Sequence, residues 1–369
     1  RQIRVGLIDT AQRDQPGSMR AYAETLQIAM ASHAPLIGTE MIGLGAASVG
    51  GRWAQRMASV SLLARARAVR GLHPDIWHVL DGSRAYVAAT LGPEPVIVTA
   101  HDIIPVRQAR GDFPAAPKVG WAARWLWQGN ARATRRAAAV VAVSESTKVD
   151  LGACIGVANG RTTVVPMPLR QSLARLLAGA EAERVGGRVL HVGNNAFYKN
   201  RPQVLRIFAA MDATLATELV MVGPPPPSEL RQLVSELGLS GRVRWEDGAD
   251  DHALAHWYRS AMLMLFPSVY EGFGWPALEA MAFALPVVAS NAGSLPEVIG
   301  DAAACLRPDA TADFVAKAEA LLRSPDHWES SSRRALMRAA QFSEQRFAQQ
   351  MQDIYLRIAR PEHGSWISS

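Results

Sequence analysis

Two glutamates, two glycines and two prolines lie close together in the stretch FPSVYEGFGWPALEA. Gly272 and Gly274 permit a tight turn whose backbone can come close to a ligand. Pro276 suits the first turn of a helix, because the N–H that it lacks would have no partner there. Glu271 and Glu279 would then lie in the turn and in the helix, where both carboxylates could accept hydrogen bonds from hydroxyls of one bound molecule.

The start of this predicted helix is also a candidate anion site. Backbone amides at a helix N-terminus lack helical partners, and the helix dipole adds positive potential there. One interpretation is therefore a phosphate or diphosphate held by the amides near residues 273–275, beside hydroxyls held by the glutamates. The other is an ordinary helix start with two solvated glutamates, and this stretch alone leaves both open.

The elements that position this stretch follow from the apolar pattern of the whole chain. Short runs rich in Val and Ile alternate with helix-length amphipathic segments, which is typical of βαβ units with a parallel sheet covered on both faces. The predicted strands are residues 3–8, 76–80, 95–100, 139–143, 162–166, 188–193, 218–223, 242–245, 262–266 and 286–290. The predicted helical segments include 52–70, 119–137, 201–213, 228–237 and 343–360.

The first five predicted strands are separated from the last five near residues 168–187, by two prolines and a polar stretch. We therefore predict two doubly wound α/β domains that face each other across a cleft. The first comprises residues 1–170 and the second residues 171–342, and the segment 343–369 could pack back onto the first. Ligands of such sheets bind outside the carboxyl ends of the strands, and the glutamate stretch follows a strand in this way.

Composition narrows the class of protein. The 369 residues are 49% hydrophobic and 20% charged, which indicates a globular chain, and no apolar run reaches the 18 residues expected of a membrane-spanning helix. The first residues, RQIRVGLID, favour a strand over a signal peptide. Two cysteines, Cys154 and Cys305, are too few for a disulfide scaffold or a zinc site and favour a reducing compartment. The sequence contains neither G-x-G-x-x-G after the first strand nor G-x-x-x-x-G-K-[ST], and its histidines do not form a metal-binding pattern.

Charge is distributed unevenly along the chain. Residues 1–170 hold 20 of the 39 Lys and Arg but only 11 of the 33 Asp and Glu, a net charge of +9, whereas the remainder has a net charge of −3. A basic half is expected to meet an anionic partner, although no sequence motif indicates nucleic acid. The segment KVGWAARWLWQGNARATRRAA, residues 118–138, mixes Trp with Arg as membrane-interface helices do. A helix that buries its tryptophans in the first domain is the alternative.

The glutamate stretch also carries a resemblance to a known family. The pattern E-G-F-G-x-P-x-L-E-A-M-A, followed by P-V-V-A-S-N and S-L-P-E-V, closely resembles the signature of family 4 retaining glycosyltransferases, which have the GT-B fold. VGNNAFYKN (192–200) is similar to the phosphate-contacting loop of the family, and AVSESTKVDL (142–151) is similar to the segment that closes its first domain. HDIIPVR (101–107) resembles the acceptor-side loop of bacterial polysaccharide mannosyltransferases.

The resemblance implies roles for the matching residues. The second glutamate of the family binds the ribose hydroxyls of the nucleotide, and the first lies against the donor sugar. Lys199 matches the lysine that neutralises the diphosphate leaving group, and His101 matches the histidine that hydrogen-bonds the donor sugar. The implied catalytic residues are Glu271, Lys199 and His101, and the implied donor-binding residues are Glu279, Gly272, Phe273, Gly274, Gly17 and Arg201.

This sequence departs from the family pattern at two loops. Many members carry an arginine where this chain has Asn194, and an Arg-Lys pair where it has Tyr198 and Lys199. Arg201 is therefore our candidate for the second cation that holds phosphate, with an arginine on a helix surface as the alternative. Gly17 matches a loop that approaches the diphosphate from the first domain, where the family often has two glycines.

The resemblance implies a retaining glycosyltransferase that needs neither a metal nor a cofactor besides its nucleotide-sugar co-substrate. We expect GDP-mannose as the donor, and as the acceptor a hydroxyl of a glycan or of a polyprenyl-diphosphate-linked intermediate in bacterial surface polysaccharide synthesis. A UDP-sugar-dependent enzyme with another acceptor is one alternative, and a non-catalytic nucleotide-sugar- or carbohydrate-binding protein of the same fold is another. The expected location is the cytoplasm, either free or peripheral on the inner face of an anionic membrane.

Overall fold

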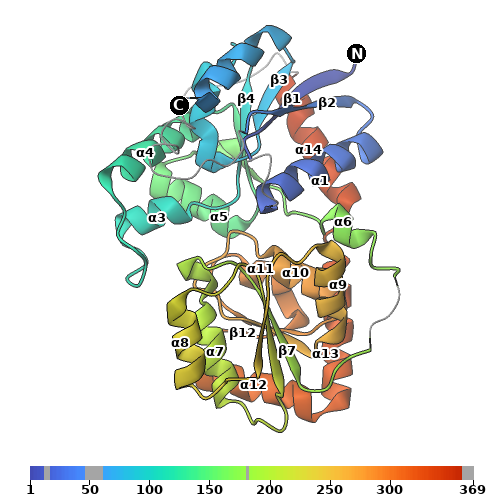
Figure 1. Cartoon of the computed structure of the whole chain (residues 1–369). Helices are drawn as coiled ribbons and strands as arrows, with labels where there is room; N and C mark the ends of the chain where they lie inside the picture. Colours follow the sequence, from blue (N-terminus) through green and yellow to red (C-terminus); the bar gives the residue numbers. More distant parts are fainter. Residues whose placement is uncertain (12–16, 46–60, 180–182, 360–369) are drawn as a thin grey trace. The chain divides into compact units, whose positions relative to one another are not determined.

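The computed structural model describes residues 1–11, 17–45, 61–179 and 183–359. The chain divides into two compact units (Figure 1). Unit 1 comprises Arg1–Phe113, Pro117–Pro168 and Glu344–Ser369. Unit 2 comprises Pro114–Ala116 and Leu169–Ser343. The chain therefore passes from unit 1 to unit 2 at residues 168–169 and returns at residues 343–344.

Unit 1 is built around a parallel sheet with the strand order β2-β1-β3-β4-β5-β6. These strands are β1 (Ile3–Asp9), β2 (Ile37–Gly43), β3 (Ile76–Val79), β4 (Val96–Ala100), β5 (Ala139–Ala142) and β6 (Thr162–Val164). All residues of β3 and β5 are buried, which explains why their sequences are apolar except for His78. The strand order reverses between β1 and β3, so the switch point of this sheet lies there.

Helices cover both faces of the unit 1 sheet. They are α1 (Ser18–His33), η1 (Val69–Leu72), η2 (Gly82–Thr90), α3 (Ile104–Arg110), α4 (Trp121–Arg136), α5 (Glu145–Asp150), η3 (Leu151–Ile155), η4 (Asn159–Arg161) and α14 (Glu344–Ala359). Helices α1 and α14 lie side by side, and α14 also contacts β1 and β3 (Figure 1). Phe347 and Tyr355 of α14 are buried. A helix that begins 180 residues after the end of β6 thus completes the core of unit 1.

Unit 2 has a parallel sheet with the strand order β12-β11-β10-β7-β8-β9. These strands are β7 (Arg188–Val192), β8 (Glu218–Val222), β9 (Val243–Glu246), β10 (Leu263–Phe266), β11 (Val287–Ser290) and β12 (Cys305–Leu306). The helices are α6 (Gln171–Ala174), η5 (Phe197–Lys199), α7 (Arg201–Ala210), α8 (Ser228–Glu236), α9 (Asp251–Ser260), α10 (Trp275–Ala282), α11 (Leu295–Ile299), η6 (Gly300–Ala302), α12 (Thr311–Arg323) and α13 (Pro325–Ala339). The strand order reverses between β7 and β10, which sets the switch point of this sheet.

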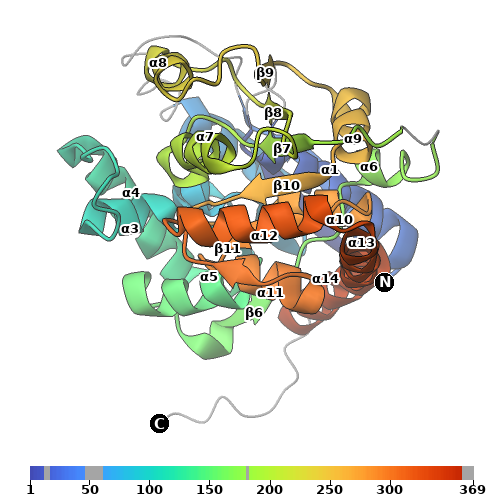
Figure 2. The same ribbon diagram turned by 90° about the horizontal axis from the view of Figure 1, so that it is seen from below.

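One face of the unit 2 sheet packs against α7, α8 and α12. Phe208, Leu230 and Phe314 from these three helices are buried in one apolar cluster with side chains of the strands. Figure 2 shows α12 lying across β10 and β11, which it contacts. Helices α9 and α10 pack against the opposite face of the sheet. They carry several of the site residues described below.

The predicted fold class is confirmed, since both units are doubly wound α/β structures with parallel sheets. Each of the ten predicted strands is present, with its ends within two residues of the prediction. The pattern does not predict β2 or β12. Strand β2 lies at an edge and carries half-buried and exposed residues such as Thr39 and Glu40, so it has no continuous apolar run, and β12 has only two residues.

The predicted helices are also present where the structure describes them. Segments 119–137, 201–213, 228–237 and 343–360 correspond to α4, α7, α8 and α14. The predicted helix 52–70 lies outside the described residues as far as residue 60, and residues 61–68 are helical. Within the described part of the chain, no helix combines the length and the apolar character needed to cross a membrane.

Candidate active site

Two loops leave the sheet of unit 2 at its switch point. The first follows β7 and carries Lys199, and the second follows β10 and carries Glu271. Because β7 and β10 are parallel neighbours, both loops leave the same edge of the sheet. Two predicted residues that are 72 positions apart in the sequence therefore meet.

Lys199 and Glu271 form a buried ion pair. The Lys199 Nζ atom donates to Glu271 Oε1 at 2.8 Å and to Oε2 at 2.9 Å. The Ser268 hydroxyl also donates to Oε1, at 2.7 Å. The two charged side chains are only 12% and 7% exposed, so each is stabilised mainly by its partner. A cation held in this way can keep its charge while it contacts an anionic ligand.

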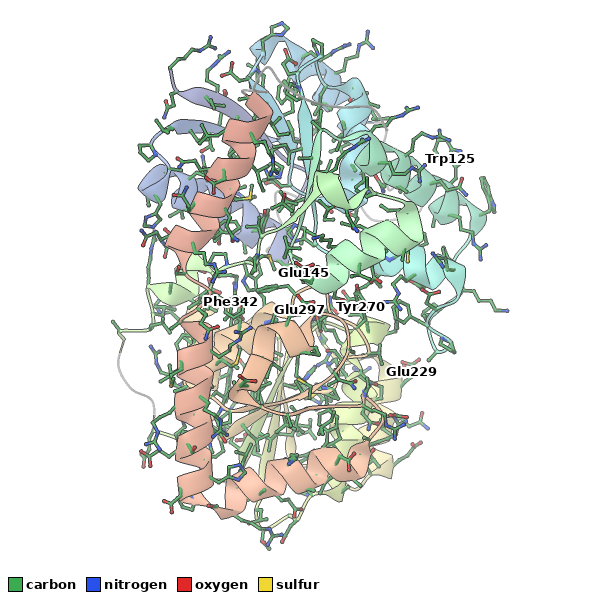
Figure 3. The ribbon with its side chains drawn as sticks, turned by 180° about the vertical axis from the view of Figure 1, so that it is seen from behind. Trp125, Glu145, Glu229, Tyr270, Glu297 and Phe342 are labelled. Atoms are coloured by element: carbon green, nitrogen blue, oxygen red, sulfur yellow. The ribbon has the colours of Figure 1, made fainter. Side chains whose placement is uncertain are left out.

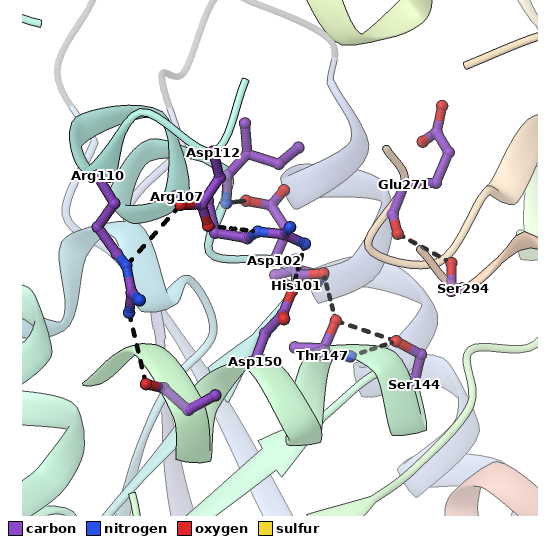
Figure 4. Close-up of polar contacts among 12 residues, drawn as sticks. His101, Asp102, Arg107, Arg110, Asp112, Ser144, Thr147, Asp150, Glu271 and Ser294 are labelled. Atoms are coloured by element: carbon purple, nitrogen blue, oxygen red, sulfur yellow. Dashed lines mark hydrogen bonds and ion pairs between the residues drawn. The ribbon is translucent and has the colours of Figure 1, made fainter. Parts of the chain in front are cut away.

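The backbone of Glu271 is held by the turn that follows β11. The Ser294 hydroxyl donates to the Glu271 carbonyl at 3.1 Å, and the Ser294 amide donates to the same oxygen (Figure 4). Gly293 has a φ of +60°, and a Cβ atom there would lie 2.3 Å from the same carbonyl oxygen. Only glycine fits this close approach. Gly293, Ser294 and Ser268 are not among the predicted site residues, although the position of Ser268 three residues before Glu271 indicates that the two side chains could lie close together.

The glycine turn and the helix after it form as predicted. Gly274 has a φ of +92°, and a Cβ atom at this position would lie 2.7 Å from the side chain of Leu295. Gly274 is the N-cap of α10 and has no side chain that could accept from the helix amides, and Pro276 lies in the first turn. The ring of Phe273 is buried with its centroid 5.8 Å from that of Phe342, so Phe273 offers a ligand its backbone rather than its side chain.

Glu279 lies on α10 and is held by two side chains from distant parts of unit 2. The Arg170 Nε atom donates to Glu279 Oε1 at 2.5 Å, and the Tyr258 hydroxyl donates to Oε2 at 2.7 Å. Arg170 also pairs with Asp251 at 3.0 Å. Burial, and to a smaller extent the negative charge of Glu279, raise the pKa of Tyr258 well above its usual value, so its hydroxyl stays protonated. No sequence pattern indicates Arg170 or Tyr258, because they lie 109 and 21 residues from Glu279, beyond any local spacing.

Arg201 is buried rather than on the surface of its helix, with 2% of the residue exposed. Its Nη1 atom donates to the Asn195 side chain and, at 3.0 Å, to the Pro224 carbonyl. The guanidinium lies 5.1 Å from the centroid of the Trp245 ring. Among the described residues, Nε and Nη2 are buried without a hydrogen-bond partner. Burial lowers the pKa of Arg201 to about 10, which leaves it charged at neutral pH.

A buried histidine lies on β7, close to these cations. The His191 ring donates from Nδ1 to the Leu265 carbonyl at 3.0 Å, and its Nε2 atom is buried without a partner in the described part of the chain. Burial lowers the pKa of His191 to about 3, and the charges of Arg201 and Lys199 act in the same direction. The neutral imidazole therefore adds no positive charge to the site.

His101, the predicted residue of unit 1, follows β4. Its Nε2 atom donates to the Leu80 carbonyl at 2.9 Å, and its ring packs edge-on against Tyr22 with the centroids 4.6 Å apart. Burial lowers the pKa of His101, so the ring is neutral. With Nε2 carrying the proton, Nδ1 is an acceptor, and it is buried without a partner among residues that the structure describes. Figure 4 shows the His101 carbonyl accepting from Thr147, at 3.4 Å.

A second histidine supports this region of unit 1 from within the core. His78 is fully buried and bonds Tyr355 of α14 through Nδ1 at 2.7 Å and Thr99 of β4 through Nε2 at 2.8 Å. Thr99 also bonds the hydroxyl of Tyr22, at 3.1 Å. Burial lowers the pKa of His78 to about 3. These neutral groups fix the ring of Tyr22, against which His101 packs.

Gly17 is the exposed N-cap of α1. A Cβ atom there would have no heavy atom within 4 Å among its described surroundings, so packing within this structure does not require a glycine. Gly17 cannot cap the helix through a side chain, and the first turn of α1 holds no acidic residue. The helix N-terminus therefore keeps positive potential that suits an anion.

Unit 2 thus brings together Lys199, Glu271 and the glycine turn, with Glu279 on the helix that follows. His101 and Gly17 belong to unit 1. Arg201 lies near His191, but it contacts the loops after β7 and β8 and Trp245 of β9. The described residues include no group of three or more His, Cys, Asp or Glu side chains that could hold a metal ion.

Two families have sequence models that match this chain. The family described as "Glycosyl transferases group 1" matches residues 186–341, and "Glycosyltransferase Family 4" matches residues 38–170. The two matches cover 156 and 133 residues, most of the 369 in the chain. The chain belongs to the GT-B glycosyltransferases. Its predicted resemblance to family 4 is thereby confirmed.

This GT-B glycosyltransferase is similar to several curated bacterial proteins. It is 32% identical over 234 residues to the MMP alpha-(1->4)-mannosyltransferase of Mycolicibacterium hassiacum, a match that covers 59% of this chain and 54% of the relative. It is 35% identical over 164 residues to O-antigen chain mannosyltransferase B of Escherichia coli, with 42% of each chain covered. A D-inositol 3-phosphate glycosyltransferase of Thermobispora bispora is 29% identical, with 79% of this chain and 71% of the relative covered. The chain thus spans about half the length of the first two relatives.

Solved structures share the fold. The sucrose-phosphate synthase of Thermosynechococcus elongatus superposes with a TM-score of 0.74 at 19% identity, covering 98% of this chain and 100% of that one. Anabaena HepE in complex with UDP-glucose superposes with a TM-score of 0.69 at 17% identity, covering 96% and 99%. Both likenesses are to GT-B structures, in agreement with the fold expected from the sequence.

Proposed function

We propose that this protein is a retaining glycosyltransferase that moves a sugar from a nucleotide diphosphate donor to a hydroxyl of a glycan or lipid-linked acceptor. The observation that carries the proposal is the buried Lys199–Glu271 pair at the switch point of unit 2, with Glu279 on the adjoining helix. A cation, two carboxylates and an uncapped helix start are the groups that a diphosphate, a sugar and a ribose require.

Lys199 is proposed to stabilise the leaving group. As the bond between the anomeric carbon and the diphosphate oxygen breaks, negative charge grows on that oxygen, and a fixed ammonium group lowers the energy of this state. The backbone amides near residues 273–275, at the start of α10, would act in the same direction. This assignment gives the protein its own positive charge for the diphosphate, and it is the basis for proposing that no metal cofactor is needed.

The proposed reaction retains the configuration of the sugar. The acceptor oxygen attacks the anomeric carbon on the face that the diphosphate leaves, and the departing phosphate takes the proton of the acceptor hydroxyl. Glu271 then lies against the sugar, where its carboxylate holds a hydroxyl and stabilises positive charge at the anomeric carbon. No side chain has to act as a general base in this scheme.

His101 and Glu279 are proposed to orient the donor. The Nδ1 atom of His101 accepts a hydrogen bond from a hydroxyl of the sugar, a role that suits its neutral ring and its buried, unpartnered nitrogen. Glu279 accepts hydrogen bonds from the ribose hydroxyls, since each carboxylate oxygen can accept more than the one bond that it receives here. Gly17 at the start of α1 is proposed to approach the diphosphate.

GDP-mannose is the proposed donor. Two of the relatives named above are called mannosyltransferases, and one of them acts, by its name, on an O-antigen chain. A UDP-sugar is the second candidate, because the similar Anabaena HepE binds UDP-glucose. A panel of nucleotide sugars, each tested for raising the melting temperature of the full chain, separates the two. Stabilisation by GDP-mannose but not by UDP-glucose is the expected result, and the reverse would assign a UDP donor.

The acceptor is proposed to be lipid-linked, which requires unit 1 to bind a membrane surface. On α4, Trp121 and Trp125 lie one helical turn apart and are 79% and 74% exposed, so they are not buried in unit 1 as the alternative interpretation required. Figure 3 shows Trp125 at the outer surface of this helix. No acidic residue occurs between Asp112 and Glu145, whereas five basic residues do. Exposed tryptophans among cations suit an anionic headgroup layer.

Sedimentation with anionic liposomes tests this surface. Replacing Arg132, Arg135 and Arg136 with Glu should release the protein, because each lost cation removes about 1 kcal/mol of attraction and each new carboxylate is repelled. The matched control replaces three exposed arginines of unit 2 with Glu, namely Arg206, Arg307 and Arg333. It changes net charge equally and should leave binding unaltered. A parent protein that stays in the supernatant at low salt would instead favour a soluble acceptor.

A further inference from the structure

Arg170 occupies an unusual place in the chain. A boundary between the units falls between Pro168 and Leu169, so Arg170 is the second residue of the main segment of unit 2. The segment that follows it is fastened to the same unit, because Arg259 of α9 donates to the carbonyl of Leu176. Arg170 thus lies where the connecting chain first becomes part of unit 2.

The side chain of Arg170 bridges two helices. Its Nε atom donates to Glu279 of α10 at 2.5 Å, and its Nη1 atom donates to Asp251, the first residue of α9, at 3.0 Å. Burial lowers the pKa of this guanidinium, but the carboxylates of Glu279 and Asp251 more than offset that effect and the net shift is upward. The side chain is 18% exposed, and that of Glu279 is 3% exposed.

We propose that Arg170 is a positioning residue for the donor, which fixes Glu279 for the ribose hydroxyls and couples nucleotide binding to the chain segment that joins the units. This inference rests on the proposed function, which gives Glu279 its role toward the ribose. Arg170 itself does not touch the reacting atoms.

The geometry supplies the reason. Glu279 has a guanidinium on one oxygen and the Tyr258 hydroxyl on the other, and these two donors set the plane of the carboxylate. Planar guanidinium groups fix carboxylates in this way far better than a lysine ammonium does. Because Arg170 is two residues from the unit boundary, a movement of the connecting backbone moves the group that orients Glu279.

Coupling of this kind is reciprocal. If the position of the connecting segment alters the affinity for a nucleotide, then the nucleotide must alter the position or the stability of that segment by the same free energy. Bound ribose hydroxyls would hold Glu279 in place, and Glu279 would hold Arg170. Backbone amides of residues 169–176 should therefore exchange hydrogen more slowly when a nucleotide is bound.

Calorimetric titration of the full chain with GDP and with UDP tests the proposal. We compare the parent with Arg170→Met, which removes the charge at similar volume, and with Arg170→Lys, which keeps the charge but not the planar fork. Asp251→Asn is the matched control, since it loosens Arg170 from α9 and leaves its bond to Glu279. Hydrogen exchange over residues 169–176 is measured on the same proteins, with and without the nucleotide.

The expected results separate positioning from simple folding damage. Arg170→Met should weaken nucleotide binding at least tenfold, Arg170→Lys should weaken it by a smaller factor, and Asp251→Asn should stay within about threefold of the parent. The slowing of exchange by nucleotide should occur in the parent and disappear in Arg170→Met. In steady-state kinetics, Arg170→Met should raise the KM for the donor and leave kcat within about threefold. If Arg170→Met does not fold, the comparison of Arg170→Lys with Asp251→Asn decides.

Three results would overturn the proposal. Affinity of Arg170→Met within threefold of the parent would show that Glu279 needs no positioning by this residue. An equal loss in Asp251→Asn would mean that Arg170 serves only to hold the connecting segment on α9. A parent protein that binds neither GDP nor UDP would contradict the proposed function itself, and the inference with it.

Discussion

The two units differ in the polar groups that they bury near the carboxyl ends of their sheets. Unit 2 buries ion pairs, Lys199 with Glu271 and Arg170 with Glu279, and each carboxylate also accepts from a hydroxyl. Unit 1 buries neutral groups, in which His78 joins a tyrosine and a threonine and His101 keeps one ring nitrogen unpartnered within the described residues.

This difference between buried ion pairs and buried neutral groups determines which chemistry each unit can support. A charged group with a charged partner keeps its ionisation when buried, and it can exchange that partner for a phosphate or a ribose hydroxyl. A neutral imidazole offers direction without charge, which suits the hydroxyls of a sugar. Charge-removing substitutions should therefore act mainly on the donor site of unit 2, whereas changes of pH should act mainly through the buried histidines.

Loss of the Lys199 charge should give the largest effect. Lys199→Ala is expected to lower turnover of the donor by about 100-fold or more, because the ammonium group is proposed to act most strongly as the diphosphate leaves. The control is Lys317→Ala, which removes an exposed lysine from α12 of the same unit. Initial rates of nucleoside diphosphate release measure both. A Lys199→Ala variant within a few-fold of the parent would move the leaving-group role to another cation, and Arg201 is the next candidate.

Removing Glu279 should have a smaller effect, confined to binding. Glu279→Ala is expected to weaken nucleoside diphosphate binding by about 1–3 kcal/mol, the usual range for a lost charged hydrogen-bond partner. Calorimetry with the nucleoside diphosphate alone measures this without any sugar. Glu229→Ala on α8 is the control, because it removes an exposed carboxylate from another helix of the same unit (Figure 3). Unchanged affinity in Glu279→Ala would remove the glutamate from the ribose site.

The buried histidines predict a smaller, gradual dependence on pH. His78 titrates near its usual value of about 6.5 when unfolded but at about 3 when folded, so the unfolded chain binds the proton first. The free energy of unfolding should fall by up to about 1.4 kcal/mol for each unit that the pH drops below about 6.5.

Urea unfolding at pH 7.5, 6 and 5 measures this slope. His78→Gln, which keeps a donor and an acceptor but cannot titrate, should have a shallower slope than the parent. The slope should not vanish, because His191 in unit 2 is lowered to the same range. An identical slope in the parent and in His78→Gln would mean that burial does not keep this histidine neutral.

The sequence predicts much of the fold because the strands are covered on both faces. Continuous apolar runs such as those of β5 and β10 are visible without any tertiary information. Strand β2 is missed for the opposite reason, since an edge strand with half-exposed residues has no such run. The glycine turn and its helix are predictable because Gly274 and Pro276 are required by local backbone geometry.

The candidate site is predictable only where its residues follow a strand within a local motif. Glu271 and Glu279 are found in this way, whereas Lys199 is found through the resemblance of its loop to the family, and the parallel sheet then brings the loops together. Arg170 and Tyr258 contact Glu279 from distant segments, so spacing along the chain gives no signal for them.

The environment of Arg201 is likewise not predictable from the local sequence. The sequence leaves open whether its guanidinium binds phosphate or lies on a helix surface. Its burial depends on the Pro224 carbonyl and the Trp245 ring, which only the folded unit brings to it. Interactions between elements distant in sequence, rather than propensities of single segments, decide where such a side chain lies.

In the proposed function, unit 2 holds a sugar donor with its diphosphate at Lys199 and its sugar at Glu271. Cleavage of GDP-mannose and UDP-glucose, each with water as the only acceptor, tests it most directly when the parent and Lys199→Ala are compared by release of nucleoside diphosphate. We expect the parent to cleave at least one of the two, and Lys199→Ala to cleave it slower by about 100-fold or more. Equal rates in the two proteins, or a parent that neither cleaves nor binds either nucleotide sugar, would contradict it.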